Sequence, residues 1–96
     1  MPITGHPVIT LYVLKGKNGK RYVDITNDLT RRLREHLSKR SKGSQVLGEF
    51  IVLHTEEYAN HKSARKREKF LKSGIGRKWL DEFESQSELT RGGDSP

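Results

Sequence analysis

The sequence predicts a small α+β domain in which a three-stranded, mostly antiparallel sheet is flanked by about three helices. Three short segments are rich in β-branched and aromatic residues, as strands are. Two basic segments carry apolar residues at helical spacing, and 96 residues suffice for one modest core. We expect one domain over residues 8–85, a flexible lead over residues 1–7 and a disordered tail over residues 86–96.

The first two predicted strands form an antiparallel hairpin. Residues 8–14 follow Pro7 and are almost entirely apolar or β-branched, which is typical of a buried strand. Residues 21–25 have a similar character and follow the pair Asn18-Gly19, which tolerates positive φ in a turn. The two strands are therefore expected to pair across this turn.

The first predicted helix follows the hairpin and runs to about residue 38. Thr26 or Asn27 can cap its N-terminus, and Asp28 in the first turn suits the positive end of the helix dipole. At about 100° per residue, Arg32 lies at the border of the apolar side. That side consists of Leu29, Leu33, His36 and Leu37.

The next segments complete the sheet and begin its cover. Residues 39–46 are basic and contain Ser and Gly, so they form a loop that either follows a phosphate backbone or is a plain solvated linker. Residues 48–54 form the third strand. Asn60 caps a second helix over residues 60–73, which Gly74 ends.

The second helix carries an acid where a core residue is expected. Ala64 and Leu71 fall on one side of it, and Glu68 lies between them, one turn from each. Glu68 is the only carboxylate within residues 61–79, so it lies in the most basic part of the chain. A short third helix over residues 76–83 covers the core with Trp79, Leu80 and Phe83.

The charge of the chain favours a nucleic acid over other partners. The net charge is +7 and the pI about 9.9, which indicates a polyanionic partner, either nucleic acid or an acidic membrane surface. No apolar run approaches the length of a membrane span, and residues 1–7 lack the features of a signal peptide, so we expect a cytoplasmic protein. The absence of cysteine excludes disulfides, thiolate metal sites and a Cys nucleophile.

Several segments together resemble the GIY-YIG nuclease family over roughly residues 9–80. The two signature tripeptides of the family are similar to Thr10-Leu11-Tyr12 and Tyr22-Val23-Asp24. Asn27-Asp28-Leu29 leads into Arg32 and His36, which match the family's Arg and His on the first helix. The segment with the metal-binding Glu of small standalone bacterial members resembles Ala64-Arg65-Lys66-Arg67-Glu68, Leu71-Lys72 and Gly76-Arg77-Lys78-Trp79-Leu80.

The resemblance implies a metal-dependent active site built from Tyr12, Tyr22, Arg32, His36 and Glu68. Glu68 would bind one Mg²⁺ or Mn²⁺, with waters and a phosphate oxygen as its other ligands. Arg32 would grip the phosphate, and His36 would relay a proton or orient the site. Tyr12 is the preferred general base, with Tyr22 assisting or exchanging roles with it. A free phenol titrates near ~10, so either Tyr needs its pKa lowered by the metal or by Arg32.

DNA is the substrate that the resemblance implies, and branched and single-stranded DNA are both candidates. Standalone members have no attached recognition domain, so we expect low sequence specificity or targeting by a protein partner. The cations expected to contact the nucleic acid are Arg31, Lys39, Arg40, Lys42, Arg65, Lys69, Lys72, Arg77 and Lys78.

Each candidate residue also has an ordinary structural explanation. The two tyrosines suit amphipathic strands, and the histidine suits a packed helix face. Arg32 can form a surface ion pair with a nearby acid, for example Asp28 or Glu35. Glu68 can be a partly buried acid that Arg65 or Lys72 neutralises.

The sequence departs from the family pattern at Asp24, which stands where the second tripeptide has glycine. Its carboxylate beside Tyr22 either repels phosphate or joins Glu68 in holding the cation. Some members also use an Asn near the end of the domain, and this chain has none after Asn60. Two other functions therefore stay open: a catalytically impaired nucleic-acid-binding module of the same fold, and an interaction protein whose basic helix meets an acidic protein partner.

Overall fold

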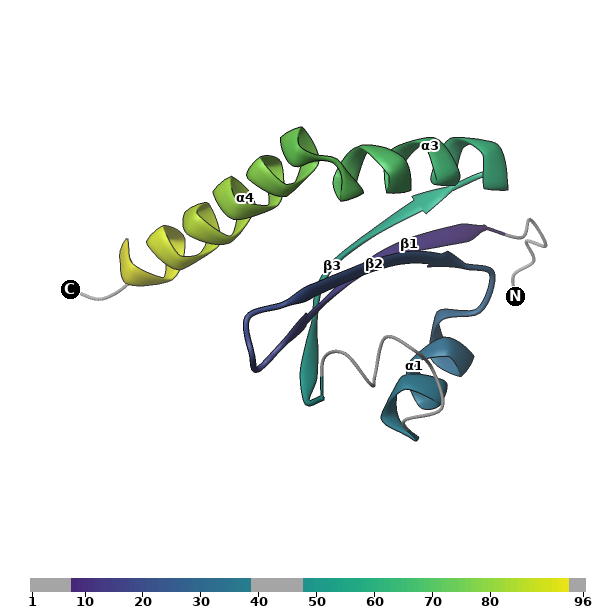
Figure 1. Ribbon diagram of the computed structural model, residues 1–96, viewed down its shortest axis with the longest axis horizontal. Coiled ribbons are helices and arrows are strands. Elements are labelled where there is room, and N and C mark those ends of the chain that lie inside the picture. Colours follow the sequence, from purple (N-terminus) through teal and green to yellow (C-terminus); the bar gives the residue numbers. More distant parts are fainter. Residues whose placement is uncertain (1–7, 39–47, 94–96) are drawn as a thin grey trace.

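The computed structural model describes the backbone of residues 8–38 and 48–93, and the side chains of these segments as far as residue 86. Three antiparallel strands form the sheet: β1 (Ile9–Gly16), β2 (Arg21–Thr26) and β3 (Phe50–Tyr58). Their order is β2-β1-β3, so β1 is central (Figure 1). The predicted α+β class with a three-stranded sheet is confirmed.

The turn between β1 and β2 depends on one glycine. Gly19 has φ of 87°, a conformation that residues with a Cβ rarely adopt. Its N–H donates to the carbonyl of Gly16 over 2.9 Å, and the N–H of Gly16 donates to the carbonyl of Lys20 over 2.8 Å. The predicted Asn18-Gly19 turn is therefore confirmed.

The register of the hairpin groups the residues of the candidate site. Tyr12 lies opposite Asp24, and Leu14 lies opposite Tyr22. Because residues opposite each other in a sheet share a face, Tyr12, Tyr22 and Asp24 all lie on the same side.

The pairing of β1 with β3 contains a bulge. Val13 lies opposite His54, but Leu14 lies opposite Val52, so Leu53 is one extra residue in β3. The strand extends to Tyr58, beyond the end at residue 54 that the sequence predicts.

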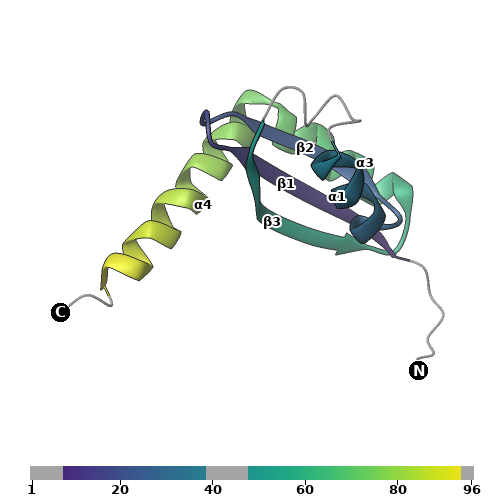
Figure 2. The same cartoon turned by 90° about the horizontal axis from the view of Figure 1, so that it is seen from below.

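Helices cover both faces of the sheet. Figures 1 and 2 show α1 (Leu29–Leu37) on one face, and α3 (His61–Lys72) and α4 (Gly74–Gly93) on the other. The core beneath α3 and α4 contains Ile9, Leu11, Val13, Val23, Ile25, Ala64, Leu71 and Leu80. The core beneath α1 is built around Tyr12 and Leu14, with Tyr22, Leu29, Leu33 and Phe50 packed against them.

The N-terminus of α1 is capped differently from the prediction. Asp28, and not Thr26 or Asn27, is the N-cap, because its carboxylate accepts the N–H of Arg31 over 3.0 Å. The helix ends at Leu37, whose side chain is 73% exposed, so the prediction that Leu37 faces the core is wrong.

The junction between α3 and α4 is tight. Asn60 caps α3 as predicted, by accepting the N–H of Ser63. A Cβ on Gly76 would meet the carbonyl oxygen of Phe70 at 1.9 Å, so only glycine lets α4 start this close to the end of α3.

The last helix differs from the prediction at both ends. Gly74 is its first residue and does not end the previous helix, whose C-cap is Ser73. Its backbone continues to Gly93, through most of the segment expected to be a disordered tail and well past the predicted end at residue 83. The predicted loop over residues 39–46 lies outside the described residues. No helix of the described segments is both long and apolar enough to cross a bilayer.

Candidate active site

Three rings from three elements pack together between the sheet and α1. Tyr12 comes from β1, Tyr22 from β2 and His36 from α1, with ring centroids 5.3 to 6.4 Å apart. The Tyr12 hydroxyl oxygen lies 3.2 Å from Nε2 of His36. Tyr12 is 0% exposed and His36 is 2% exposed, so this hydrogen bond is buried, while Tyr22 is partly exposed.

Asp24 connects the rings to Arg32. Its Oδ2 accepts one hydrogen bond from the Tyr22 hydroxyl and one from Nη1 of Arg32, each over 3.1 Å. Its Oδ1 accepts the backbone N–H of Ile25 over 2.8 Å. The carboxylate of Asp24, which the sequence places beside Tyr22, therefore also binds the Arg32 guanidinium that is expected to bind phosphate.

Arg32 lies between two carboxylates. Besides Asp24, Oε1 of Glu35 lies 3.3 Å from its Nε. That Nε is buried and makes no hydrogen bond in the part of the chain that the structure describes. The expected ion pair with Glu35 is present, and Arg32 still has donor capacity for another oxygen ligand.

The environment raises the pKa of both phenols. Burial, followed by the charge of Asp24, raises the pKa of Tyr12 far above its usual value, and the same causes raise the pKa of Tyr22 to about 12. Arg32 lowers both pKa values, but these two causes outweigh it. The lowering by Arg32 that a tyrosine general base requires is thus not achieved, and both phenols stay protonated at neutral pH.

His36 has the opposite property. Its burial, and secondarily the charge of Arg32, lowers the pKa of the imidazole below its usual 6.5. The ring is therefore neutral at pH 7, and Nε2 is able to accept the proton of the Tyr12 hydroxyl.

Glu68 lies on α3, which covers the face of the sheet opposite α1. It is 3% exposed, between the fully buried Ala64 and Leu71, as predicted. Its oxygens accept hydrogen bonds from Nη1 of Arg65 over 3.0 Å and from Nζ of Lys72 over 2.8 Å. The structural explanation for this acid, neutralisation by its neighbours, therefore describes its contacts.

The contact of Glu68 with the ring cluster is electrostatic. Its charge contributes to the raised pKa of Tyr22, after burial and Asp24. No hydrogen bond joins Glu68 to Tyr12, Tyr22 or Arg32 within the described residues. The structure thus brings Tyr12, Tyr22, Arg32 and His36 together beneath α1, whereas Glu68 lies on the helix that covers the other face of the sheet.

Glu68 is the buried carboxylate that would be available to a divalent cation as a protein ligand. In residues 8–38 and 48–86, no three His, Cys, Asp or Glu side chains gather into a metal-binding group. Mg²⁺, however, usually keeps several waters and takes one or two carboxylates together with substrate phosphate. Glu68 fits this sparse mode once Arg65 or Lys72 moves from the carboxylate.

The cations predicted to bind nucleic acid are distributed over several surfaces. Lys39, Arg40 and Lys42 lie outside the described residues. Arg65 and Lys72 bind Glu68, and the Arg31 guanidinium donates to Asn27. Lys69, Arg77 and Lys78 are exposed on α3 and α4.

The sequence indicates that the Asp24 carboxylate lies beside Tyr22, but not that the same carboxylate binds Arg32. Because side chains alternate along a strand, the sequence alone already places residues 22 and 24 on the same face of the sheet. The ion pair between Asp24 and Arg32 could not be predicted from the sequence, because it depends on how α1 crosses the sheet.

Comparison with known proteins supports the family resemblance. The family model described as the GIY-YIG catalytic domain matches residues 8–88. Neither the curated proteins nor the solved structures gave a match. Since the matched segment spans most of the chain and contains every described residue of the candidate site, the chain belongs to the GIY-YIG catalytic domain family, whose members are generally endonucleases that act on DNA.

Proposed function

We propose that this chain is an endonuclease that hydrolyses DNA phosphodiester bonds with Mg²⁺ or Mn²⁺ and with low intrinsic sequence specificity. The observation that supports this most is the convergence of Tyr12, Tyr22, Arg32 and His36 from three elements. GIY-YIG domains are generally nucleases and are typically dependent on a divalent metal, which agrees with this chemistry. A protein partner would supply targeting to particular DNA structures.

Arg32 and Tyr22 are the groups that would hold the phosphate. Both now donate to the same oxygen of Asp24, so their donors already converge on one point. A phosphate oxygen that replaces this carboxylate oxygen accepts the same two hydrogen bonds. Donors fixed in advance at a developing negative charge stabilise the transition state without reorganising.

Tyr12 and His36 would carry the proton away from the attacking water. Asp24 lies opposite Tyr12 in the sheet, so a phosphate that replaces its carboxylate would lie on the same face as the Tyr12 side chain. As this hydroxyl takes the water proton, its own proton passes to Nε2 of His36. A relay of this kind forms no phenolate, which the raised pKa of Tyr12 disfavours.

Glu68 would hold the cation from α3. When bound, the cation neutralises charge on the phosphoryl oxygens and assists departure of the alkoxide. Arg65 and Lys72, which now neutralise Glu68, would turn to DNA phosphates nearby.

A nicking assay tests the proposal. We expect the purified protein to nick supercoiled DNA and to cut single-stranded DNA in Mn²⁺, and Glu68→Ala to lose this activity. Glu82→Ala, which removes an exposed carboxylate of α4, should keep it. Equal nicking by wild type and Glu68→Ala would remove Glu68 from the mechanism, and no nicking in any metal would refute the enzyme.

Cation binding has a readout that is independent of cleavage. Mn²⁺ that binds only the folded protein raises its melting temperature by mass action. We expect such a rise for the wild type and for Glu82→Ala, and none for Glu68→Ala. An equal rise in all three proteins would place the cation elsewhere.

A nucleic-acid-binding module without catalysis is the second candidate. The ion pair between Asp24 and Arg32 favours it, because the phosphate-gripping guanidinium is already neutralised. This candidate predicts salt-sensitive DNA binding and no cleavage by the wild type. A gain of cleavage in Asp24→Gly would identify Asp24 as the inactivating residue, whereas unchanged inactivity would leave only binding.

A further inference from the structure

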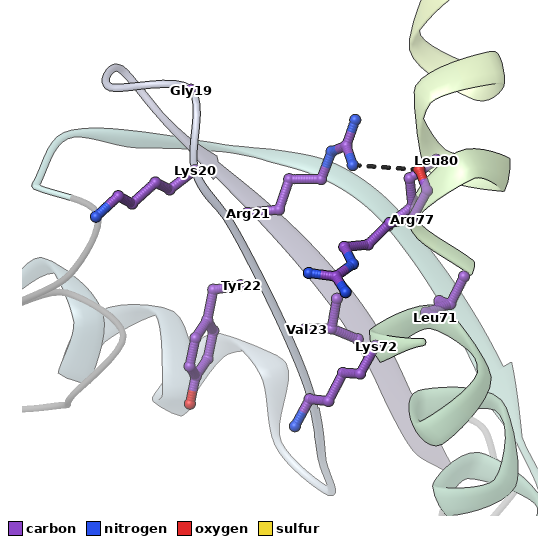
Figure 3. A pocket seen from close by; sticks show the side chains of 9 residues that line it. All are labelled: Gly19, Lys20, Arg21, Tyr22, Val23, Leu71, Lys72, Arg77 and Leu80. Carbon is purple, nitrogen blue, oxygen red and sulfur yellow. Dashed lines mark hydrogen bonds between the residues drawn. The ribbon is translucent and has the colours of Figure 1, made fainter. Parts of the chain in front are cut away.

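A groove of about 550 Å³ runs beside β2, where this edge strand meets α3 and α4 (Figure 3). It is lined by Gly19, Lys20, Arg21, Tyr22, Val23, Leu71, Lys72, Arg77 and Leu80. Its volume falls within the range of about 300–1,000 Å³ that is usual for sites that bind small organic groups.

The groove has an apolar floor and a basic rim. Val23, Leu71 and Leu80 belong to the buried core and form the floor. Figure 3 shows Lys72 and Arg77 extending along β2 from α3 and α4. A groove with apolar surface next to fixed positive charge suits a ligand that carries a phosphate together with either an unsaturated ring or a sugar.

The two arginines of the groove differ in their availability. Arg21 is bound to α4 through Asp81, Glu84 and the carbonyl of residue 77. The Arg77 guanidinium is exposed and forms no ion pair with the described residues. Arg77 is therefore the arginine of this rim that can pair with a phosphate at no structural cost.

The groove adjoins the candidate active site at two residues. Tyr22 belongs both to the groove and to the ring cluster, and Lys72 belongs to the groove while it binds Glu68. A DNA strand whose phosphate is held by Arg32 and Tyr22 would thus place its neighbouring nucleotide in the groove.

We propose that this groove binds the nucleotide next to the scissile phosphate in an unpaired strand, with Arg77 on the phosphate and the base or sugar on the apolar floor. Bases of a duplex are stacked and paired, whereas those of an unpaired strand can turn out onto a protein surface. The inference deepens the proposed function and rests on it for the location of the scissile bond.

The test measures binding in EDTA, where no metal-dependent cleavage occurs. The probe is a fluorescein-labelled oligothymidylate of roughly ten nucleotides, and its anisotropy reports the Kd of the full chain. We expect Arg77→Ala to weaken binding about fivefold and to reduce the salt slope by about 0.7, the loss of one phosphate contact on a single strand.

Lys62→Ala is the matched control. It removes one positive charge from an exposed residue of α3 that does not line the groove. We expect less than a twofold change in Kd for this variant. Equal weakening by the two variants would show a diffuse charge effect and overturn the proposed site.

Two further probes test the chemistry of the ligand. An abasic strand with the same number of phosphates should bind about fivefold more weakly than the oligothymidylate, since it leaves the apolar floor uncovered. Equal binding would remove the base from the groove. A duplex that binds as tightly as the single strand, with the same loss in Arg77→Ala, would refute the preference for an unpaired strand.

These outcomes are separable from those of the nicking assay. If the protein nicks DNA but its Arg77→Ala and Lys62→Ala variants bind the oligonucleotide alike, the endonuclease stands and the proposed groove site is refuted. Selective loss of binding in Arg77→Ala, with no nicking in any metal, keeps the groove and removes the endonuclease. Arg77→Ala should melt at the wild-type temperature, because its side chain is exposed.

Discussion

The guanidinium of Arg32 donates to Oδ2 of Asp24 over 3.1 Å, and this ion pair occupies the centre of the candidate active site. The side chains are 27% and 23% exposed. A pair with this exposure contributes little to stability, about 0.2–1 kcal/mol. Its larger effect would be on function, because Asp24 would compete with a substrate phosphate for Arg32.

Neutralising Asp24 should therefore increase affinity for DNA. We expect Asp24→Asn to lower the Kd for a short oligonucleotide up to about fivefold, which corresponds to about 1 kcal/mol. Anisotropy titrations in EDTA at fixed salt measure this change. Glu49→Gln is the control, because it neutralises an exposed carboxylate that pairs with Lys17 away from the cluster. An equal gain in both variants would attribute the effect to net charge alone.

The hydrogen bond between Tyr12 and His36 should contribute to stability. Tyr12→Phe removes the hydroxyl and leaves the buried Nε2 of His36 without this partner, at a cost of about 1–3 kcal/mol in the free energy of unfolding. Urea denaturation measures the loss. Tyr58→Phe, which removes a hydroxyl from a partly exposed tyrosine bound to Glu56, should cost less. The reverse order would contradict the assignment of a buried, coupled pair.

The lowered pKa of His36 predicts a loss of stability in mild acid. The unfolded chain binds a proton near pH 6.5, while the folded protein resists that proton until a lower pH. The unfolding free energy should therefore be constant above pH 7 and should fall below about pH 6.5, by at most about 1.4 kcal/mol per pH unit.

The variant His36→Gln separates this effect from other titrations. Glu56 and Glu84 also have lowered pKa values, but both titrate below the usual glutamate value of 4.5, outside this range. Urea midpoints between pH 7.5 and 5.5 should fall for the wild type and remain level for His36→Gln. Parallel curves for the two proteins would show that another group titrates.

Glu84 should stabilise the contact between α4 and the hairpin. Its carboxylate is 14% exposed and accepts hydrogen bonds from Nε of Arg21 over 2.7 Å and from Lys15. We expect Glu84→Ala to lose about 1–3 kcal/mol of unfolding free energy in urea denaturation. Glu82→Ala, on the exposed side of the same helix, should change it by less than about 0.5 kcal/mol. Similar values for both variants would deny Glu84 this role.

Local patterns predicted most of the fold, because the signals are local in origin. The Asn18-Gly19 turn, the Asn60 cap and the apolar alternation of the hairpin are set within a few residues of sequence. The cap at Asp28 was missed because Thr26, Asn27 and Asp28 are all competent caps, and tertiary packing chooses between them. The length of α4 was missed because polar residues 84–93 give no apolar period.

The sequence indicated which residues of the candidate site can meet, but not how they change the pKa values of one another. Strand alternation and helix spacing indicate that Tyr12, Tyr22 and Arg32 can meet. They do not show that burial and Asp24 together raise the pKa of both phenols, since this depends on the depth of the site and on contacts across elements. For the same reason, the position of Glu68 between Ala64 and Leu71 predicted that its side chain is buried, but not how far it lies from the three rings.

The extra residue Leu53 in β3 interrupts the alternation of side chains between the two faces of the sheet. Before it, Val52 sits opposite Leu14 on the α1 side, and after it, His54 sits opposite Val13 on the α3 side. Deleting that single residue would leave Val52 directly before His54, and because these two residues already face opposite sides, the strand would alternate strictly with both halves in their present orientation. Loss of one residue at this position is therefore a length change that β3 can accept without turning its side chains to the wrong face.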